Sequence, residues 1–285
     1  MTIDPVLKAN IARSFQRLNL EAAGSFPGTG ALSDALNKLA PPKSATPTSI
    51  SLQQGPSTMF PKAGVDCWMR AVHSFLVSAA LTDVSPIWAS VAGYYSSHYS
   101  VRAIAHILGC FQLFRVGQIV QREFSGNQLQ CTYSRKNGSD REHKIYWKFV
   151  KANSLFASDP LFTENDSTRD PSDAGHRDFA NYKDFLQNFP TFHPLDRVHL
   201  RERIQKISSI EFTAPPIPSV SRYPDVESVQ VVAYHRLVRF RELLDDILVD
   251  NNNFWTVHRN PPWARDLLDY QLVDSRLDAA RVAGG

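Results

Sequence analysis

The feature that most constrains the fold is a run of apolar residues that recur at every third or fourth position from Val65 to Thr82. This period matches one face of an α-helix, whereas a strand would alternate its side chains between two faces. After a break at 83–86, the same period predicts a second helix from Ile87 to about Phe114. We therefore expect two long consecutive helices at the centre of the molecule. The apolar positions of the first helix are Trp68, Ala71, Val72, Phe75, Leu76, Ala79 and Ala80.

The remaining sequence predicts a mainly α fold, a helical bundle with a small antiparallel β insertion. The alternation of polar and apolar residues typical of strands occurs at 116–123, 128–134 and 144–150, with turn sequences between these segments. The helix with the broadest apolar stripe is expected at 225–250 and should be central. Further helices are predicted at 6–20, 177–189, 196–210 and 263–283. The stripe comprises Val229, Val232, Ala233, Leu237, Phe240, Leu243, Leu244, Ile247 and Leu248.

The N-terminal 62 residues differ in composition from the core domain, which we place at 63–285. Six prolines and four glycines lie within the 42 residues of 21–62, which is typical of an extended arm. At most one short helix is expected there, around Leu32, Leu36 and Leu39. The arm could cover the body of the molecule or another protein, and a segment this poor in large apolar residues needs contacts outside itself to become ordered.

Composition excludes several classes of protein. The chain has 43% hydrophobic and 21% charged residues, which are ordinary globular values. Its 31 Lys and Arg exceed its 28 Asp and Glu by only three, so the net charge does not indicate a nucleic-acid partner. The three cysteines form no C-x-x-C pair, and no apolar segment is long enough to span a bilayer. We expect a cytoplasmic protein without a membrane partner.

Signatures of metal, cofactor and nucleophile chemistry are lacking. His193 and His199 flank Pro194 without a carboxylate pair in register, and neither H-E-x-x-H nor G-x-S-x-G occurs. The glycines of the arm are not followed by the Gly-Lys-Ser/Thr of a phosphate-binding loop. We therefore expect no metal and no cofactor.

One face of the second predicted helix is unusually polar. At 100° per residue, Tyr95, His98, Arg102 and His106 fall within a narrow sector that lies opposite the apolar side. These side chains either are half-buried groups satisfied by neighbouring helices or form an anion site, because arginine offers a planar fork and histidine can donate from either nitrogen. In both cases we expect the four to share a cleft or an interface.

The same helix resembles a known family. The stretch 90–103, Ser-Val-Ala-Gly-Tyr-Tyr-Ser-Ser-His-Tyr-Ser-Val-Arg-Ala, resembles the long helix of HEPN domains, with two tyrosines, small residues, an aromatic residue and an Arg-Ala pair. The resemblance covers about 64–113 and extends to the long helix near 240. It implies an all-α bundle that is usually dimeric and that belongs to prokaryotic toxin-antitoxin or antiviral defence systems, either as a metal-independent ribonuclease or as a binding partner.

The family's ribonucleases carry an arginine followed, after four to six residues, by a histidine. Arg102 and His106 have only three residues between them, which departs from this pattern. The pair with the family's spacing is Arg169 and His176, in a segment that we predict to be a loop. The catalytic candidates are therefore Arg169 with His176, or Arg102 with His106 and His98.

A basic patch coincides with the predicted β insertion. Between residues 115 and 151, eight Lys or Arg and three Asp or Glu give a local balance of +5, interleaved with aromatic residues. Basic side chains neutralise phosphates and aromatic rings stack on bases, so this patch is a candidate RNA contact. The alternative is a solvated hairpin whose aromatic residues pack on the helices. The candidate residues are Lys136, Arg141, Lys144, Lys148, Tyr133, Tyr146 and Trp147.

The sequence as a whole favours a HEPN-like binding and assembly module with RNA or another protein subunit as its partner. A homodimer through the helical core is a further possibility that the resemblance implies. Two alternatives stay open: a metal-independent endoribonuclease, and a purely structural subunit of a larger assembly.

Overall fold

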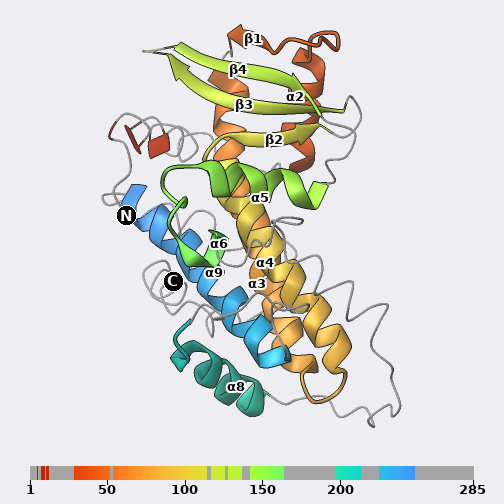
Figure 1. Cartoon of the computed structure of the whole chain (residues 1–285), viewed down its shortest axis with the longest axis vertical. Helices are drawn as coiled ribbons and strands as arrows, with labels where there is room; N and C mark the ends of the chain where they lie inside the picture. Colours follow the sequence, from red (N-terminus) through yellow and green to blue (C-terminus); the bar gives the residue numbers. More distant parts are fainter. Residues whose placement is uncertain are drawn as a thin grey trace, which may run out of the picture.

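The computed structural model is mainly helical, with one four-stranded antiparallel sheet (Figure 1). It describes residues 5, 8, 9, 11, 12, 29–51, 54–113, 117–125, 128–136, 142–163, 197–212 and 225–247. The predicted fold class is thereby confirmed. The helices are α2 (Thr29–Leu39), α3 (Gln54–Leu81), α4 (Pro86–Ile107), α5 (Glu142–Ala152), α6 (Pro160–Thr163), α8 (Arg197–Ser209) and α9 (Val226–Ile247), and the strands are β1 (Thr48–Ser51), β2 (Cys110–Leu113), β3 (Gln118–Ser125) and β4 (Gln128–Arg135).

The core is built on α3 and α4, which lie side by side, with α9 packed against both (Figure 1). α4 begins at Pro86, whose ring presets the helical φ angle and whose missing N–H is not needed in a first turn. The indole of Trp68 stacks on Phe240 at 5.9 Å and donates a hydrogen bond to the Leu237 carbonyl at 3.2 Å. The predicted central position of the α9 stripe is confirmed from Val229 to Ile247.

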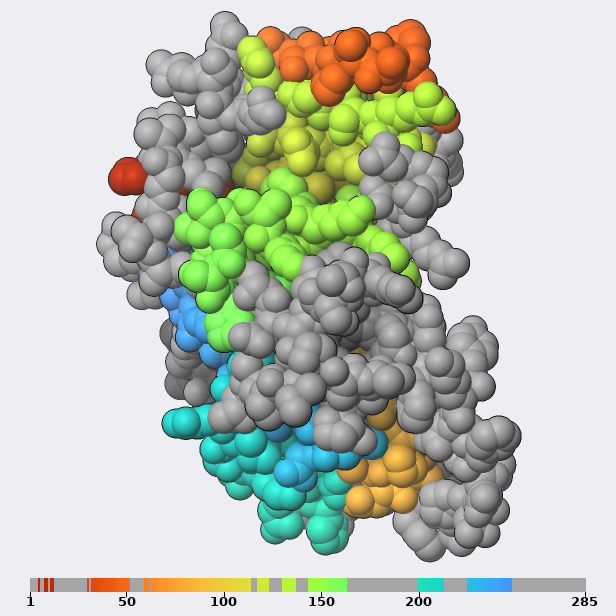
Figure 2. Space-filling model, viewed as in Figure 1, coloured from red at the N-terminus to blue at the C-terminus, as the bar shows by residue number. Residues whose placement is uncertain are grey.

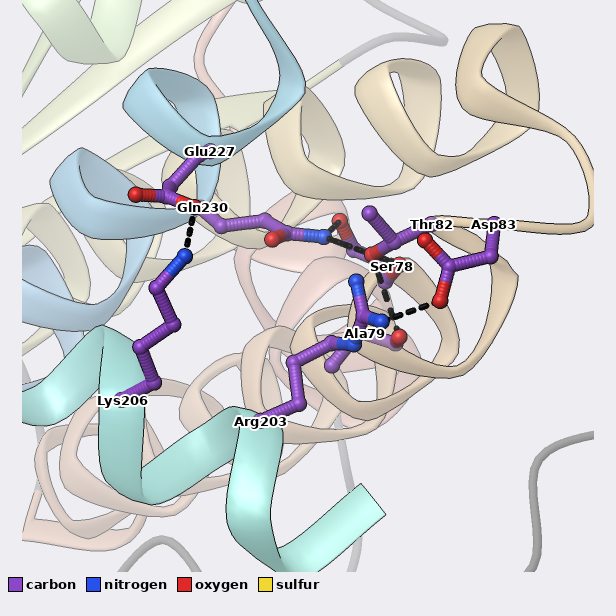
Figure 3. Close-up of polar contacts among 8 residues, drawn as sticks. All are labelled: Ser78, Ala79, Thr82, Asp83, Arg203, Lys206, Glu227 and Gln230. Carbon is purple, nitrogen blue, oxygen red and sulfur yellow. Dashed lines mark hydrogen bonds and ion pairs between the residues drawn. The ribbon is translucent and has the colours of Figure 1, made fainter. Parts of the chain in front are cut away.

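A polar seam joins α3 to α8 and α9 on the side shown in Figure 3. The side-chain amide of Gln230 donates to the Ser78 carbonyl at 3.0 Å and to Oγ1 of Thr82 at 2.7 Å. Ion pairs join Arg203 to Asp83 and, at 2.6 Å, Lys206 to Glu227 at the surface. α9 is thereby held to α3 by buried hydrogen bonds, with α8 attached at the edge.

The sheet has the strand order β1-β4-β3-β2, and every pairing in it is antiparallel. Phe111 pairs with Val120, which pairs in turn with Tyr133, and these three side chains form one buried face. That face packs on residues of α2 and α3, including Leu36 and Phe60. In Figure 2, α5 and α6 form a green band between the sheet and the cyan surface of α8.

The second central helix ends earlier than predicted. It stops at Ile107, and the residues up to Leu113 form strand β2 instead of continuing the helix to Phe114. Gly109 turns the chain with a φ of +93°, a conformation that other residues rarely adopt. Arg122 fills the corner by donating from Nη2 to the Ile107 carbonyl at 3.0 Å. The local turn at Gly109 and the packing of Arg122 together end a helix whose apolar period continues in the sequence.

The third predicted strand is also wrong, because 144–150 lies within helix α5. The buried residues are Ile145, Tyr146, Trp147 and Val150, which follow the spacing of a helix packed on α4. The local alternation of Ile145, Trp147 and Phe149 suggested a strand by coincidence.

The boundary drawn at residue 62 falls inside a helix. α3 begins at Gln54 and continues through Pro61, although an internal proline costs about 3 kcal/mol. Phe60 and Ala63 are fully buried, so packing outweighs that cost. The predicted short helix of the arm is confirmed as α2, whereas β1 was not predicted. Both are held by contacts with α3 and the sheet, outside the segment itself.

Several predictions lie outside the described residues. They are the helices at 177–189 and 263–283, most of the helix at 6–20, and the candidate site residues Arg141, Arg169 and His176. In the part of the chain that is described, no helix has both the length and the apolar character needed to cross a membrane.

Candidate binding site

The four polar residues singled out on the second helix all lie on α4 and face α5. Tyr95 and His98 have ring contacts with His143, at 6.3 Å and 4.3 Å between centroids. Arg102 lies over the ring of Tyr146 at 5.4 Å, and His106 meets the same ring edge-on at 5.3 Å. The expectation of a shared interface is confirmed, and that interface is with α5.

His106 is fully buried, and both of its ring nitrogens are engaged. Nε2 accepts a hydrogen bond from Nε of Arg102 at 3.2 Å, and Nδ1 donates to the Cys110 carbonyl at 2.8 Å. Burial, together with the charge of Arg102, lowers the pKa of His106 to about 3. The imidazole is therefore neutral at physiological pH and joins the end of α4 to β2.

Two residues of this cluster were not among the sequence candidates. The Tyr94 hydroxyl and Nδ1 of His143 share a hydrogen bond of 2.7 Å, and the Tyr94 ring stacks on His98 with an interplanar angle of 7°. These contacts attach the first turn of α5 to the middle of α4. The sequence carried no signal for them, because Tyr94 and His143 are 49 positions apart and 143 adjoins a segment predicted as a strand.

The aromatic part of the predicted RNA contact is wrong. Tyr133, Tyr146 and Trp147 are at most 2% exposed, so none of them can stack on a base. The Tyr133 hydroxyl donates to the Leu36 carbonyl, and Trp147 lies 4.4 Å from the guanidinium of the buried Arg236. Of the basic candidates, Lys136 follows β4, whereas Lys144 and Lys148 lie on α5.

An open groove of about 410 Å³ lies between α3 and α4, close to the loop that joins them. Trp88 forms part of its wall with 60% of its surface exposed, which is unusual for the largest apolar side chain. Tyr95 connects the groove to the α4–α5 cluster, since it belongs to both. The lining residues are His73, Ser74, Val77, Leu81, Trp88, Val91, Ala92, Tyr95 and Tyr99.

Two arginines lie near the Tyr99 end of the groove. Burial raises the pKa of Tyr99, while the nearby cations of Arg70 and Arg102 oppose that rise. The side chain of Arg70 is half exposed, and its Nε lies 3.3 Å from the buried carboxylate of Asp66. Two cations and one carboxylate therefore lie near this end of the groove.

The structure does not bring together a metal site within the part of the chain that it describes: no cluster of three or more His, Cys, Asp or Glu could hold an ion there. The three cysteines, Cys67, Cys110 and Cys131, are buried thiols.

Comparison of the chain with protein-family models, with curated proteins and with solved structures yields no match in any of the three. The interpretation of the site therefore depends on its own geometry.

Proposed function

We propose that this protein is a HEPN-like binding and assembly module that docks a protein partner in the groove between α3 and α4. The observation that carries the proposal is the groove itself, an open cavity with an apolar lining and an exposed tryptophan in its wall. Exposed apolar surface of this kind is characteristic of interaction sites, because water-facing aromatic surface has no role in a monomer's own packing.

The titratable groups of α4 favour binding over catalysis. A general acid or base must reach the proton that it transfers, and His106 is buried with both nitrogens engaged. His98 is 2% exposed within the aromatic cluster. These histidines join α4 to α5 and β2 through their ring contacts and the hydrogen bond to the Cys110 carbonyl.

A protein partner fits the groove better than RNA does. Of the nine lining residues in the described part of the chain, five have apolar or nearly apolar side chains that suit the side chains of a protein: Val77, Leu81, Val91, Ala92 and Trp88. RNA binding usually depends on several phosphate contacts along a basic surface, and among the described residues that line this cavity there is neither lysine nor arginine.

The resemblance of 90–103 to HEPN helices supplies the setting of the proposal. This resemblance supports a role in the cytoplasm of a prokaryote, as a subunit of a defence or toxin-type complex. In that setting a second copy of the chain is one form that the protein partner could take.

The test uses a photo-reactive phenylalanine analogue at position 88, introduced in cells that naturally express the protein. We expect a discrete cross-linked protein adduct. Ala92→Arg, which fills the groove, should abolish the adduct, and Ser208→Arg, which adds the same cation to the exposed face of α8, should leave it intact. An adduct that survives Ala92→Arg, or none at all, would overturn the proposal.

A second measurement separates the alternatives. The purified protein is mixed with total RNA in the presence of EDTA and scored for retention and for cleavage. Cleavage would support the endoribonuclease, and retention without cleavage an RNA-associated module. A chain that shows neither, and forms no adduct, would be a structural subunit.

A further inference from the structure

We infer that the segment docked in this groove is an acidic amphipathic α-helix of the partner. The inference rests on the proposed function and specifies the chemistry of its partner. Three features of the groove carry it: the spacing of the residues along its wall, a small residue between two large ones, and the distribution of charge on α3 and α4.

The spacing indicates a helix. The α4 wall consists of Trp88, Ala92, Tyr95 and Tyr99, at intervals of four, three and four residues. On α3, Ser74, Val77 and Leu81 follow at intervals of three and four. Side chains that repeat in this way along two adjacent helices form the surface against which a third helix packs. At 1.5 Å per residue the α4 wall is about 16 Å long, or three helical turns.

Ala92 provides a place for a large side chain of the partner. Ala92 lies one turn from Trp88 and nearly one turn from Tyr95, so its short side chain leaves a hollow between two aromatic rings. Val77 and Ser74 contribute to the lining from α3. A leucine or phenylalanine on the partner would fill this hollow as a knob fits a hole.

The charge distribution indicates the sign of the partner. α4 contains no Asp or Glu, and the sole carboxylate of α3 is Asp66, which is 4% exposed and already paired with Arg70. The half-exposed Arg70 lies near the Tyr99 end of the groove, where its charge and that of Arg102 act on the Tyr99 hydroxyl. At the opposite end, Asp83 is paired with Arg203. Acidic residues beside the apolar stripe of the partner would therefore meet favourable charges and no unpaired carboxylate of these two helices.

The experiment is a selection from a display library of 16-residue peptides on the immobilised full-length chain. We expect the enriched peptides to share large apolar residues at three- and four-residue spacing, to carry net negative charge, and to gain helical circular dichroism on binding. Ala92→Arg should weaken their binding at least tenfold, as expected when a knob loses its hole. Ser208→Arg should have no effect.

Arg70→Gln tests the charge separately. This substitution should lower the affinity for acidic peptides by about two- to fivefold, the range expected for a partly exposed ion pair. It should also reduce the salt dependence of binding. Thermal unfolding of each variant shows whether it is folded, and Arg70→Lys should restore most of the affinity.

Different peptide results would overturn this inference alone or the proposed function together with it. Peptides that compete for the groove and are sensitive to Ala92→Arg, yet are basic, neutral or extended, would overturn this inference and leave the proposed function standing. Enriched peptides that are insensitive to Ala92→Arg would overturn both, as would the absence of any enrichment.

Discussion

Nε of Arg102 donates a hydrogen bond to Nε2 of His106, four residues later on α4, at 3.2 Å. A cation therefore stands against the one nitrogen on which His106 could accept a proton. The other nitrogen donates to the Cys110 carbonyl, so the neutral imidazole completes the junction between α4 and β2. The stability of the protein should consequently depend on the protonation of this single side chain.

The first prediction concerns pH. The folded pKa of His106 is lowered to about 3 from an ordinary value of 6.5, so between these values the unfolded chain binds the proton and the folded chain does not. The contribution of the neutral His106 to the free energy of unfolding is therefore fully present above pH 6.5 and decreases as the pH falls towards 3. From pH 7.5 to 5, this residue should account for a loss of about 2 kcal/mol.

Urea unfolding at the two pH values measures this effect. His106→Gln should be less stable than wild type at pH 7.5 and should show a smaller decrease on acidification. Equal decreases in the two proteins would show that His106 is not held neutral by the fold.

The second prediction concerns the turn after α4. A Cβ at Gly109 would lie 2.7 Å from Cβ of Arg122, and the φ of +93° is itself unfavourable for alanine. Gly109→Ala should therefore destabilise the protein by about 1–3 kcal/mol in a thermal unfolding assay. Gly30→Ala is the matched control, because a Cβ there meets no atom within 4 Å and α2 should gain stability from it. A harmless Gly109→Ala would contradict the geometry of this corner.

The third prediction compares the buried hydrogen bonds of Gln230 with the exposed ion pair of Lys206, both drawn in Figure 3. Gln230→Met keeps the approximate volume but leaves the Ser78 carbonyl and the Thr82 hydroxyl without this donor, which should cost about 1–3 kcal/mol. Lys206→Gln removes an exposed ion pair and should change stability by less than about 1 kcal/mol. Guanidinium unfolding of both variants checks the ranking, and a larger effect for Lys206 would refute it.

The fourth prediction compares the buried Trp68 with the exposed Trp88 in their contributions to stability. Trp68 is 1% exposed and stacks on Phe240, so Trp68→Ala should cost about 3–5 kcal/mol. Trp88→Ala should change stability by no more than about 0.5 kcal/mol, because that side chain is mostly exposed. The same variant should weaken the cross-linked or peptide-bound complex, and a Trp88→Ala protein that is both unstable and fully competent in binding would reverse the assignment.

Local patterns in the sequence predicted the elements whose period matched their final environment. α3, α4 and α9 are long enough for an apolar stripe to be distinguished from chance, and α8 was also expected within one residue of its ends. The two strands β3 and β4 alternate because one face of the sheet is buried against α2 and α3. For these elements, the period of the apolar residues was sufficient to identify the type of element, although α4 and α9 also bury residues outside the apolar stripe.

The candidate site was less predictable from the sequence than these elements, because its side chains meet partners from distant parts of the chain. That Tyr95, His98, Arg102 and His106 share a face follows from helix geometry alone, so it was predictable. Their partners His143 and Tyr146 were not, because α5 has the local alternation of a strand and becomes a helix by packing on α4. The same packing buries the aromatic residues that had suggested an RNA contact.

The sequence by itself thus determined the helical character of the core and the polar face of α4, since both follow from the periodicity of side chains along one element. Tertiary structure decided that α5 is a helix and that Trp88 borders an open groove, and it completed the end of α4 that the local turn at Gly109 begins. Each of these depends on contacts between residues far apart in the chain, such as Arg122 with Ile107 or α3 with Trp88, and their free energy outweighs the local preference of the segment.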